Sequence, residues 1–326
     1  FVETSPVAAW LDRATDGVQS TGNARLGLRL ELRPSLPEDR ARVGGELQLV
    51  DNQLRVPGLP AFTRVNGRLG FSERELNVRD IAFEAYGGPG RLTLSRRDGA
   101  TRVSGTGTAN LAALRNDVNG LPLERVSGTA DWRIDLTHRA GALSWTVDSN
   151  LRGASVDLPS PLRKSAAEAV AFRLERRPAT GDAGRDTLIA QYGEGVRVVA
   201  ERRTNGRDTT VERALVLLGK AAGRSVQPDR PGVTLRGDVA KVDVDEWLGV
   251  MRADERRATT RPATALELAA IELDAGELVV FGRRFEKAKI SARRGSDGWR
   301  ATIDSRPLEG TVTWSPASER QANGRV

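Results

Sequence analysis

Few side chains in this sequence could carry out catalysis. His138 is the only histidine among 326 residues, in the segment THRAG at 137–141, and cysteine is absent. A histidine-based catalytic triad therefore has no visible support, and metal sites built from several histidines and cysteines are excluded. The simplest interpretation of His138 is a solvated residue in a turn between two strands.

Three other patterns also lack the spacing that their chemistry needs. The acidic segment DVDE at 243–246 has neither the glycine nor the spacing of a calcium-binding EF-hand loop, and more simply indicates a strand end followed by a helix cap. The segment YGGPG at 86–90 is not followed by Lys-Ser/Thr, as a phosphate-binding loop requires. Carboxylate pairs of the glycosidase type stay open as an alternative, but no segment singles one out. The sequence predicts no enzyme and no cofactor.

The charge pattern is typical of a solvated surface. There are 50 Lys and Arg against 43 Asp and Glu, a net charge of +7, and only 5% of residues are aromatic. Basic and acidic residues are interleaved, as in DERR at 254–257, whereas nucleic-acid binders concentrate positive charge and often add stacking aromatics. We therefore expect no nucleic-acid partner.

Alternation with a period of two is the dominant signal for secondary structure. In ARLGLRLEL at 24–32, every second residue is leucine and the residues between are largely charged. The segments at 125–136 and 141–151 show the same alternation around tryptophan, isoleucine, leucine and valine. Such alternation predicts strands with one apolar and one polar face. The short turn at 137–141 predicts a hairpin between these two segments.

Turn signals separate many such strands. They include VDNQ at 50–53, RRDGA at 96–100, RTNGR at 203–207 and GSDGW at 295–299. Because short connections favour antiparallel neighbours, we predict a mainly β fold, a long twisted antiparallel sheet without parallel βαβ units. Short helices are expected near 5–14, 110–115 and 245–251, the last two capped by Asn110 and Asp245. The polar stretches 177–186, 219–231 and 252–264 are predicted to be loops.

Glycine recurs on the apolar face of the predicted strands. RVNGRLGF at 64–71 and RVSGTADW at 125–132 both place a glycine two residues after a valine. Glycine inside a strand often marks a bulge, a bend or a close approach of another chain or ligand. The repetition indicates strong coiling of the sheet, with or without a notched concave surface.

The apolar face needs a cover. Four large apolar side chains left in water would forfeit roughly 6–12 kcal/mol per strand, and a few short helices cannot cover so many strands. Either a second sheet or an apolar ligand in an open, curved sheet would serve, and periodicity does not decide between them.

The chain begins at Phe1 and ends at Val326, which we interpret as a segment of a longer protein. No run of eighteen apolar residues and no signal peptide is present. We expect three segments: 1–165 and 166–250, both part of a β groove, the second with loops near 177–186 and 219–231, and 251–326, a closing repeat after a mobile linker. They are expected to form one continuous body.

Several stretches resemble the AsmA-like family of Gram-negative envelope proteins, in its YhdP branch. The most specific is LRGASVDLPSPLRK at 151–164, with a Leu-Pro-x-Pro-Leu-x-Lys pattern. The strand–turn–strand unit at 59–89, the segment VTLRGDVAKVDVDEWL at 233–248 and the unit at 271–314 are also similar. The resemblance covers most of 1–314, in order, and contains no catalytic motif.

This resemblance implies a curved, groove-forming β-sheet in the periplasm, within a protein anchored in the inner membrane. Its implied function is to conduct or guide phospholipids between inner and outer membranes, with acyl chains as the partners of the groove. The candidate groove lining is the inward set Leu26, Leu28, Leu30, Leu47, Leu49, Val65, Leu69, Phe71, Trp132, Ile134, Leu136, Leu143, Trp145 and Val147. Two alternatives are a structural scaffold for outer-membrane assembly with a closed core, and a carbohydrate-acting β-protein. The aliphatic neighbours of Trp132 and Trp145 disfavour the latter.

Overall fold

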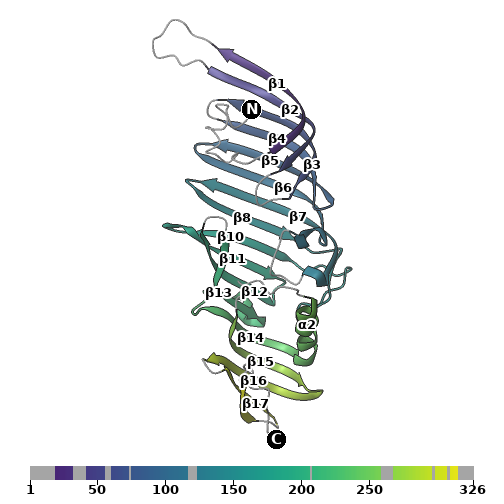
Figure 1. Cartoon of the computed structure of the whole chain (residues 1–326), viewed down its shortest axis with the longest axis vertical. Coiled ribbons are helices and arrows are strands. Elements are labelled where there is room, and N and C mark those ends of the chain that lie inside the picture. Colours follow the sequence, from purple (N-terminus) through teal and green to yellow (C-terminus); the bar gives the residue numbers. More distant parts are fainter. Residues whose placement is uncertain are drawn as a thin grey trace. The chain divides into compact units, whose positions relative to one another are not determined.

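The computed structural model describes residues 19–31, 42–55, 60–72, 75–116, 123–205, 208–257, 267–295, 298–306 and 309–314. These residues fold mainly into strands, as predicted, with few helices (Figure 1). The chain divides into two compact units, unit 1 with most of residues 19–155 and unit 2 with most of 178–314. The predicted helix at 5–14 lies outside the described residues. The predicted division into three segments stays a prediction.

Unit 1 is an antiparallel meander in which each strand from β1 to β8 pairs with the next along the chain. Two short 3₁₀ helices precede its seventh strand, η1 (Ala113–Asn116) and η2 (Leu123–Arg125). The Asn110 side chain, predicted to cap a helix at 110–115, accepts a hydrogen bond from the Ala112 N–H at 3.0 Å, just before η1. The strands are β1 (Gln19–Glu31), β2 (Arg42–Arg55), β3 (Phe62–Ser72), β4 (Leu76–Ala85), β5 (Gly88–Arg97), β6 (Ala100–Asn110), β7 (Val126–Arg139) and β8 (Ala142–Ser149).

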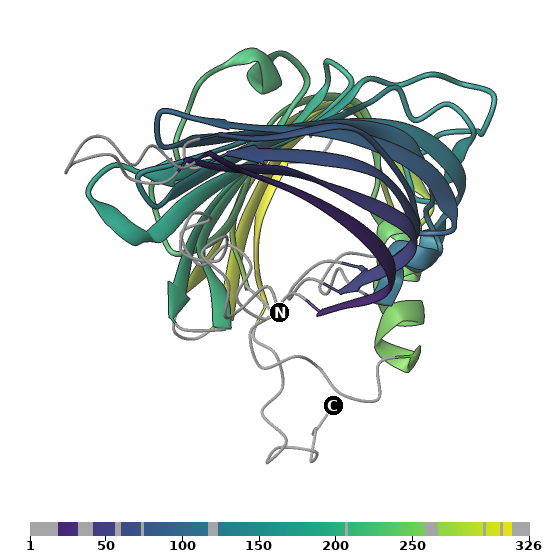
Figure 2. The same cartoon turned by 90° about the horizontal axis from the view of Figure 1, so that it is seen from above.

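Unit 1 bends at bulges that carry left-handed residues. The pairing register shifts in β2, β3 and β4, and Asp51, Arg64 and Asp80 at these shifts have φ near +50°. A bulge bends a strand and increases its twist, and the strands of unit 1 arch along their length in Figure 2. Asn52, which is 2% exposed, supports one bulge by donating to the Asn23 carbonyl at 2.7 Å. The predicted turn at 50–53 is therefore wrong, since β2 continues through it as a bulge.

Unit 2 contains the C-terminal strands, the longest helix described and the 3₁₀ helix η3 (Gly219–Gly223). The short β9 (Ala154–Val156) and β10 (Phe172–Ala179) include residues of both units. The other elements are β11 (Asp182–Tyr192), β12 (Val196–Asn205), β13 (Asp208–Leu218), β14 (Gly232–Asp243), α2 (Val244–Arg257), β15 (Leu268–Val280), β16 (Arg283–Gly295), β17 (Gly298–Arg306) and β18 (Glu309–Trp314).

The sheet is mixed rather than purely antiparallel. β13 pairs with β14 and β14 pairs with β15 in parallel. The pairs from β11 to β13 and from β15 to β18 are antiparallel. The expected absence of parallel βαβ units is thus wrong at β14–α2–β15. A parallel pair needs a long connection between its strands. Between β14 and β15, α2 forms most of this connection and lies beside β15 (Figure 1). The helix is twice as long as the one predicted at 245–251.

The three predicted loops have different outcomes. Residues 177–186 form the ends of β10 and β11 joined at Thr180–Gly181, so a tight turn replaces the loop. The stretch 219–231 is a connection containing η3, and Ala222 packs on Leu215 and Leu217 of β13. The stretch 252–264 begins inside α2, and its remainder lies outside the described residues.

Two aspartates at the start of α2 have separate tasks. Asp243 caps the helix, because its Oδ1 accepts the Glu246 N–H at 3.0 Å. Asp245, the predicted cap, instead accepts the N–H groups of Phe281 and Gly282 at 2.9 and 2.8 Å. These two residues form the β15–β16 turn with φ of 50° and 70°. Asp245 therefore ties the helix to a turn whose conformation is unfavourable for phenylalanine.

Replacing each aspartate by alanine is expected to destabilise unit 2 to a different extent. Asp243→Ala removes a helix cap and should cost about 1 kcal/mol. Asp245→Ala removes two charge-assisted hydrogen bonds and should cost about 1.5–3 kcal/mol. Glu246→Ala is the matched control, since its ion pair with Arg163 is exposed and is worth at most about 1 kcal/mol. Urea denaturation measures all three, and an equal effect of Asp245→Ala and Glu246→Ala would contradict the role of Asp245.

Candidate functional site: an apolar sheet face in unit 1

One face of unit 1 carries a continuous line of apolar side chains across eight strands. Consecutive cross-strand partners place one residue of each strand from β1 to β8 in this line. Cross-strand neighbours on the same face of a sheet are in direct side-chain contact range. We call the line the apolar row: Leu26, Leu47, Leu69, Val78, Leu94, Val103, Leu136 and Trp145.

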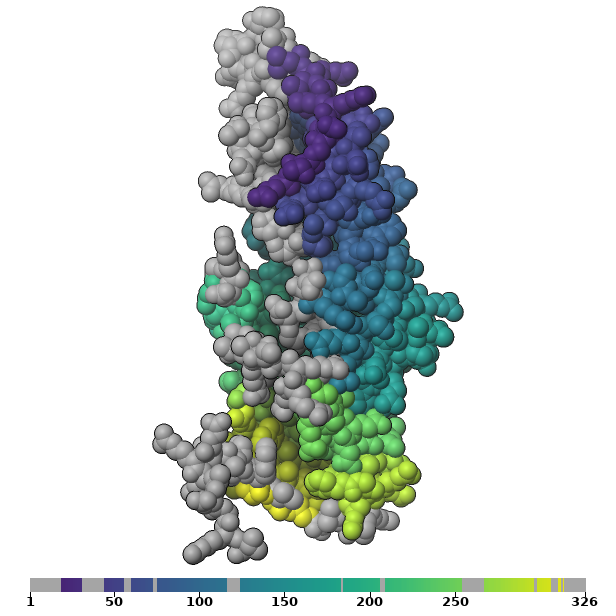
Figure 3. Space-filling model, turned by 45° about the vertical axis from the view of Figure 1, so that its right-hand side comes forward, coloured from purple at the N-terminus to yellow at the C-terminus, as the bar shows by residue number. Residues whose placement is uncertain are grey.

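The candidate lining residues all lie on this face, but their burial differs. Leu26, Leu28 and Leu30 of β1 are 46%, 66% and 58% exposed, and β1 lies at the surface of unit 1 (Figure 3). Val65 is 1% exposed and belongs to a packed cluster with Val78, Ile81 and Phe83. The remaining candidates are half-buried: Leu47, Leu49, Leu69, Phe71, Trp132, Ile134, Leu136, Leu143, Trp145 and Val147.

Strands β4 to β6 contribute as much to this face as the strands predicted to line it. Val78, Ile81, Phe83, Leu92, Leu94 and Val103 were not among the candidates, although the apolar row passes through three of them. The sequence contains the pattern that would identify them. The same period-two alternation that marks the candidate lining residues is present at Leu76 and Val78, and at Leu92 and Leu94.

Glycines on the apolar face make room for aromatic rings of the neighbouring strand. A Cβ at Gly90 would lie 2.5 Å from the Phe83 ring, and one at Gly107 would lie 2.6 Å from the Trp132 ring. Phe83 in turn stands edge-on to Phe62, with ring centroids 5.2 Å apart. These notches are therefore filled by the protein's own rings, which is a physical reason for the glycines that needs no ligand.

The apolar face contains polar side chains on three neighbouring strands. Next to the apolar row, in the same register, Arg96, Thr101 and His138 are paired across β5, β6 and β7. His138 is a half-buried strand residue, and the turn falls at Ala140–Gly141, so the interpretation of His138 as a solvated turn residue is wrong. Leu76 of β4 and Leu143 of β8 flank these three residues in the same register, so the face combines an apolar strip with a small basic and polar patch.

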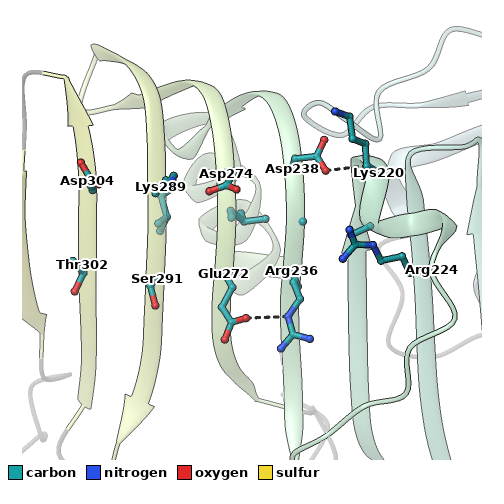
Figure 4. A pocket seen from close by; sticks show the side chains of 14 residues that line it. Lys220, Arg224, Arg236, Asp238, Glu272, Asp274, Lys289, Ser291, Thr302 and Asp304 are labelled. Atoms are coloured by element: carbon teal, nitrogen blue, oxygen red, sulfur yellow. Dashed lines mark hydrogen bonds and ion pairs between the residues drawn. The ribbon is translucent and has the colours of Figure 1, made fainter.

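A cavity of about 520 Å³ lies in unit 2, lined by charges of both signs (Figure 4). Arg236 donates to Glu272 at 2.9 Å, and the Lys220 backbone N–H donates to Asp238 at 3.0 Å. Asp274 and Asp304 face Lys289 across the sheet. Beside the cavity, hydrogen bonding from Arg230 lowers the pKa of Asp229 below its usual value. In the described part of the chain, no three His, Asp or Glu residues are placed to hold a metal ion.

Comparisons with known proteins agree with the resemblance seen in the sequence. A family model described as YhdP protein matches residues 1–325. The chain is 28% identical over 268 residues to the intermembrane phospholipid transporter YhdP of Escherichia coli (strain K12). The match covers 77% of this chain and 20% of that relative, so the chain spans about a fifth of the relative's length. No solved structure matches. Among the described helices, none is long and apolar enough to cross a membrane.

Proposed function

The chain belongs to the YhdP protein family, and on that premise we propose that it is a lipid-conducting segment of an envelope protein. In this proposal the apolar face of unit 1 guides phospholipids between the inner and outer membranes and so supports the outer-membrane barrier. The segment acts in the periplasm, within a protein anchored in the inner membrane. Its work is physical transfer, without a catalytic step or a cofactor.

The apolar row is the observation that carries the proposal. It has one apolar residue on each of eight strands, and most of its members are only half-buried. At a strand spacing of about 4.8 Å the row is roughly 34 Å long. One leaflet of a bilayer has a hydrocarbon thickness of about 15 Å, half of the whole. The row is therefore long enough for an acyl chain to lie across several strands and advance along it.

The energetics suit transfer without a specific binding site. An acyl chain gains about 0.8 kcal/mol for each methylene that leaves water. About a dozen methylenes on the apolar face therefore offset roughly 10 kcal/mol of the cost of leaving a bilayer. A uniform apolar strip also leaves no deep minimum in which a lipid would be trapped, which is what a conduit requires.

A closed scaffold is the second candidate, and one observation favours it. Val65, Val78, Ile81 and Phe83 are nearly inaccessible and pack with Leu49, Leu69 and Trp132. This part of the face is already sealed by its own side chains. Val78 is also a member of the apolar row, so in this proposal a lipid that advances along the row passes Val78 on the half-buried and exposed side chains around the cluster.

Site-specific photo-crosslinking tests the proposal directly. A benzophenone-containing amino acid in place of Leu136, on the apolar face, is expected to crosslink to phospholipid in the envelope. The same amino acid in place of Arg133, which is exposed on the opposite face of β7, is the matched control and is expected to give no lipid adduct. Lipid adducts are detected by mass spectrometry of the purified protein.

The two candidates give opposite results in this experiment. Adducts at Leu136 and not at Arg133 support conduction along the apolar face. A folded protein without lipid adducts at Leu136 or Leu47 supports the scaffold and ends the conduit hypothesis for unit 1.

A further inference from the structure

One ion pair of unit 2 lies beside the apolar part of a sheet face. Arg202 Nε donates to Asp186 Oδ1 at 2.7 Å, and Nη2 donates to Oδ2 at 3.1 Å. The Asp186 side chain is 3% exposed and that of Arg202 is 22% exposed. Two parallel N–H···O bonds hold the guanidinium in a fixed plane.

The pairing of β11 with β12 defines the surroundings of this ion pair. Asp186 is directly opposite Arg202, and the next three pairs on the same face are apolar. Val196, at the far end, is buried in a cluster with Leu218 and Leu273. We call this set the tail stripe: Leu188, Ala190, Tyr192, Val196, Val198 and Ala200. The ion pair therefore stands at one end of an apolar stripe.

The contribution of this ion pair to folding stability does not by itself explain why Asp186 and Arg202 are charged. Replacing a buried ion pair by apolar residues is often neutral or stabilising, because both charges lose hydration. The neighbouring Arg203 shows the ordinary arrangement on the opposite face. It pairs with Glu212 at 2.7 Å, both side chains are about one-third exposed, and this contact lowers the pKa of Glu212.

Arg202 keeps hydrogen-bonding capacity after pairing with Asp186. A guanidinium has five N–H groups, and the two bonds to Asp186 use two of them. The planar fork of arginine matches the oxygens of a phosphate group particularly well. Asp186 offsets part of the charge of Arg202 when no ligand is bound, so the attraction for an anion is moderate and permits release.

We propose that Arg202, oriented by Asp186, binds the phosphate of a phospholipid whose acyl chain lies on Leu188, Ala190 and Val198, half-buried members of the tail stripe. The inference rests on the proposed function and adds a headgroup contact to it. An amphiphile fits because a fixed donor for an anion and an apolar stripe are adjacent on one face. Free phosphate would use the donor and leave the stripe unused.

The test uses the full-length protein with a photo-crosslinking amino acid in place of Val198. The probes are dioctanoyl phosphatidylethanolamine and dioctanoylglycerol, which differ in the phosphate headgroup. Arg202→Met is expected to lower the yield of phosphatidylethanolamine adduct about tenfold, the effect of losing one charge-assisted hydrogen bond. The dioctanoylglycerol yield should stay unchanged.

Two further variants separate this role from a structural one. Arg203→Met removes the adjacent arginine on the opposite face and is expected to change neither yield. The double variant Asp186→Leu/Arg202→Met removes both charges, so no buried charge is left without its partner. Its phosphatidylethanolamine yield should fall by the same factor of about ten, and thermal unfolding checks that it is folded.

Three results would overturn the inference. The first is an unchanged phosphatidylethanolamine yield in Arg202→Met, and the second is equal yields of the two lipids in the wild type. The third is inorganic phosphate that competes as well as the whole phospholipid. By contrast, a wild-type protein that crosslinks to neither lipid, here or at Leu136, contradicts the proposed function itself.

Discussion

Leu28→Asp is expected to reduce lipid transfer at least tenfold while leaving the protein folded. Leu28 is 66% exposed, so its replacement removes little buried apolar area. A carboxylate at this position would have to be desolvated by each passing acyl chain, and an unpaired charge in an apolar environment is strongly disfavoured. Transfer is measured with fluorescent phospholipid between donor and acceptor vesicles, and in cells by restoration of the outer-membrane barrier.

Arg29→Asp is the matched control for this variant. It places the same carboxylate one residue further along β1, where alternation turns the side chain to the opposite face. Arg29→Asp is expected to transfer lipid like the wild type. Transfer at the wild-type rate by Leu28→Asp would remove β1 from the lipid path.

Ile134→Asp tests whether lipid reaches the apolar face at a position that is partly covered by protein. Ile134 is half-buried and lies between Gly105 and Val147 in the pairing of β6, β7 and β8. A folded but inactive variant supports a groove open to lipid at this position. An unfolded variant means that this stretch is a closed core, because a buried charge without a partner is not tolerated.

Alternation in the sequence predicted which residues share a face, but not how deeply each is buried. Leu28 and Val65 follow the same period-two pattern, yet one is 66% and the other 1% exposed. The difference lies in their neighbours. Val65 sits in β3 between β2 and β4, which both pair with it, whereas β1 is the first described strand of unit 1 and pairs with β2. Burial on a sheet depends on partners that are distant in sequence.

Strand direction was the other feature that local patterns did not reveal. β13, β14 and β15 alternate like the antiparallel strands, and their parallel pairing follows from what connects them. The segment DVDEWLGVM predicts a helix, but a shorter one than α2. A long connection is needed to bring the chain back to the end of the sheet where β14 begins, as parallel pairing requires. Arg202 and Asp186 were missed for a related reason, because they are 16 residues apart and only the hairpin brings them together.

Two glycines of the apolar face should respond differently to the same added methyl group. The three atoms nearest to the Cβ of Gly90→Ala would all belong to the ring of Phe83, at 2.5–3.2 Å. The Cβ of Gly107→Ala would meet the Pro89 carbonyl oxygen at 2.6 Å and the Gly90 Cα at 2.9 Å, besides the Trp132 ring. A second substitution can remove a side chain that the added methyl group meets, but it cannot remove backbone atoms. Overpacking of this kind costs about 1–3 kcal/mol, and we expect Gly107→Ala to lie at or above the upper end.

Double-mutant cycles distinguish the two cases. Adding Phe83→Leu to Gly90→Ala is expected to recover about 1–2 kcal/mol relative to the sum of the single variants, since the obstructing ring is gone. Adding Trp132→Leu to Gly107→Ala should recover much less, because the clash with the backbone of β5 persists. Gly195→Ala, where a Cβ would meet nothing within 4 Å, is the control and should stay within about 0.5 kcal/mol of wild type. The free energies come from urea denaturation. Equal rescue in both cycles would show that ring packing alone, and not the approach of the strand backbones, requires glycine on this face.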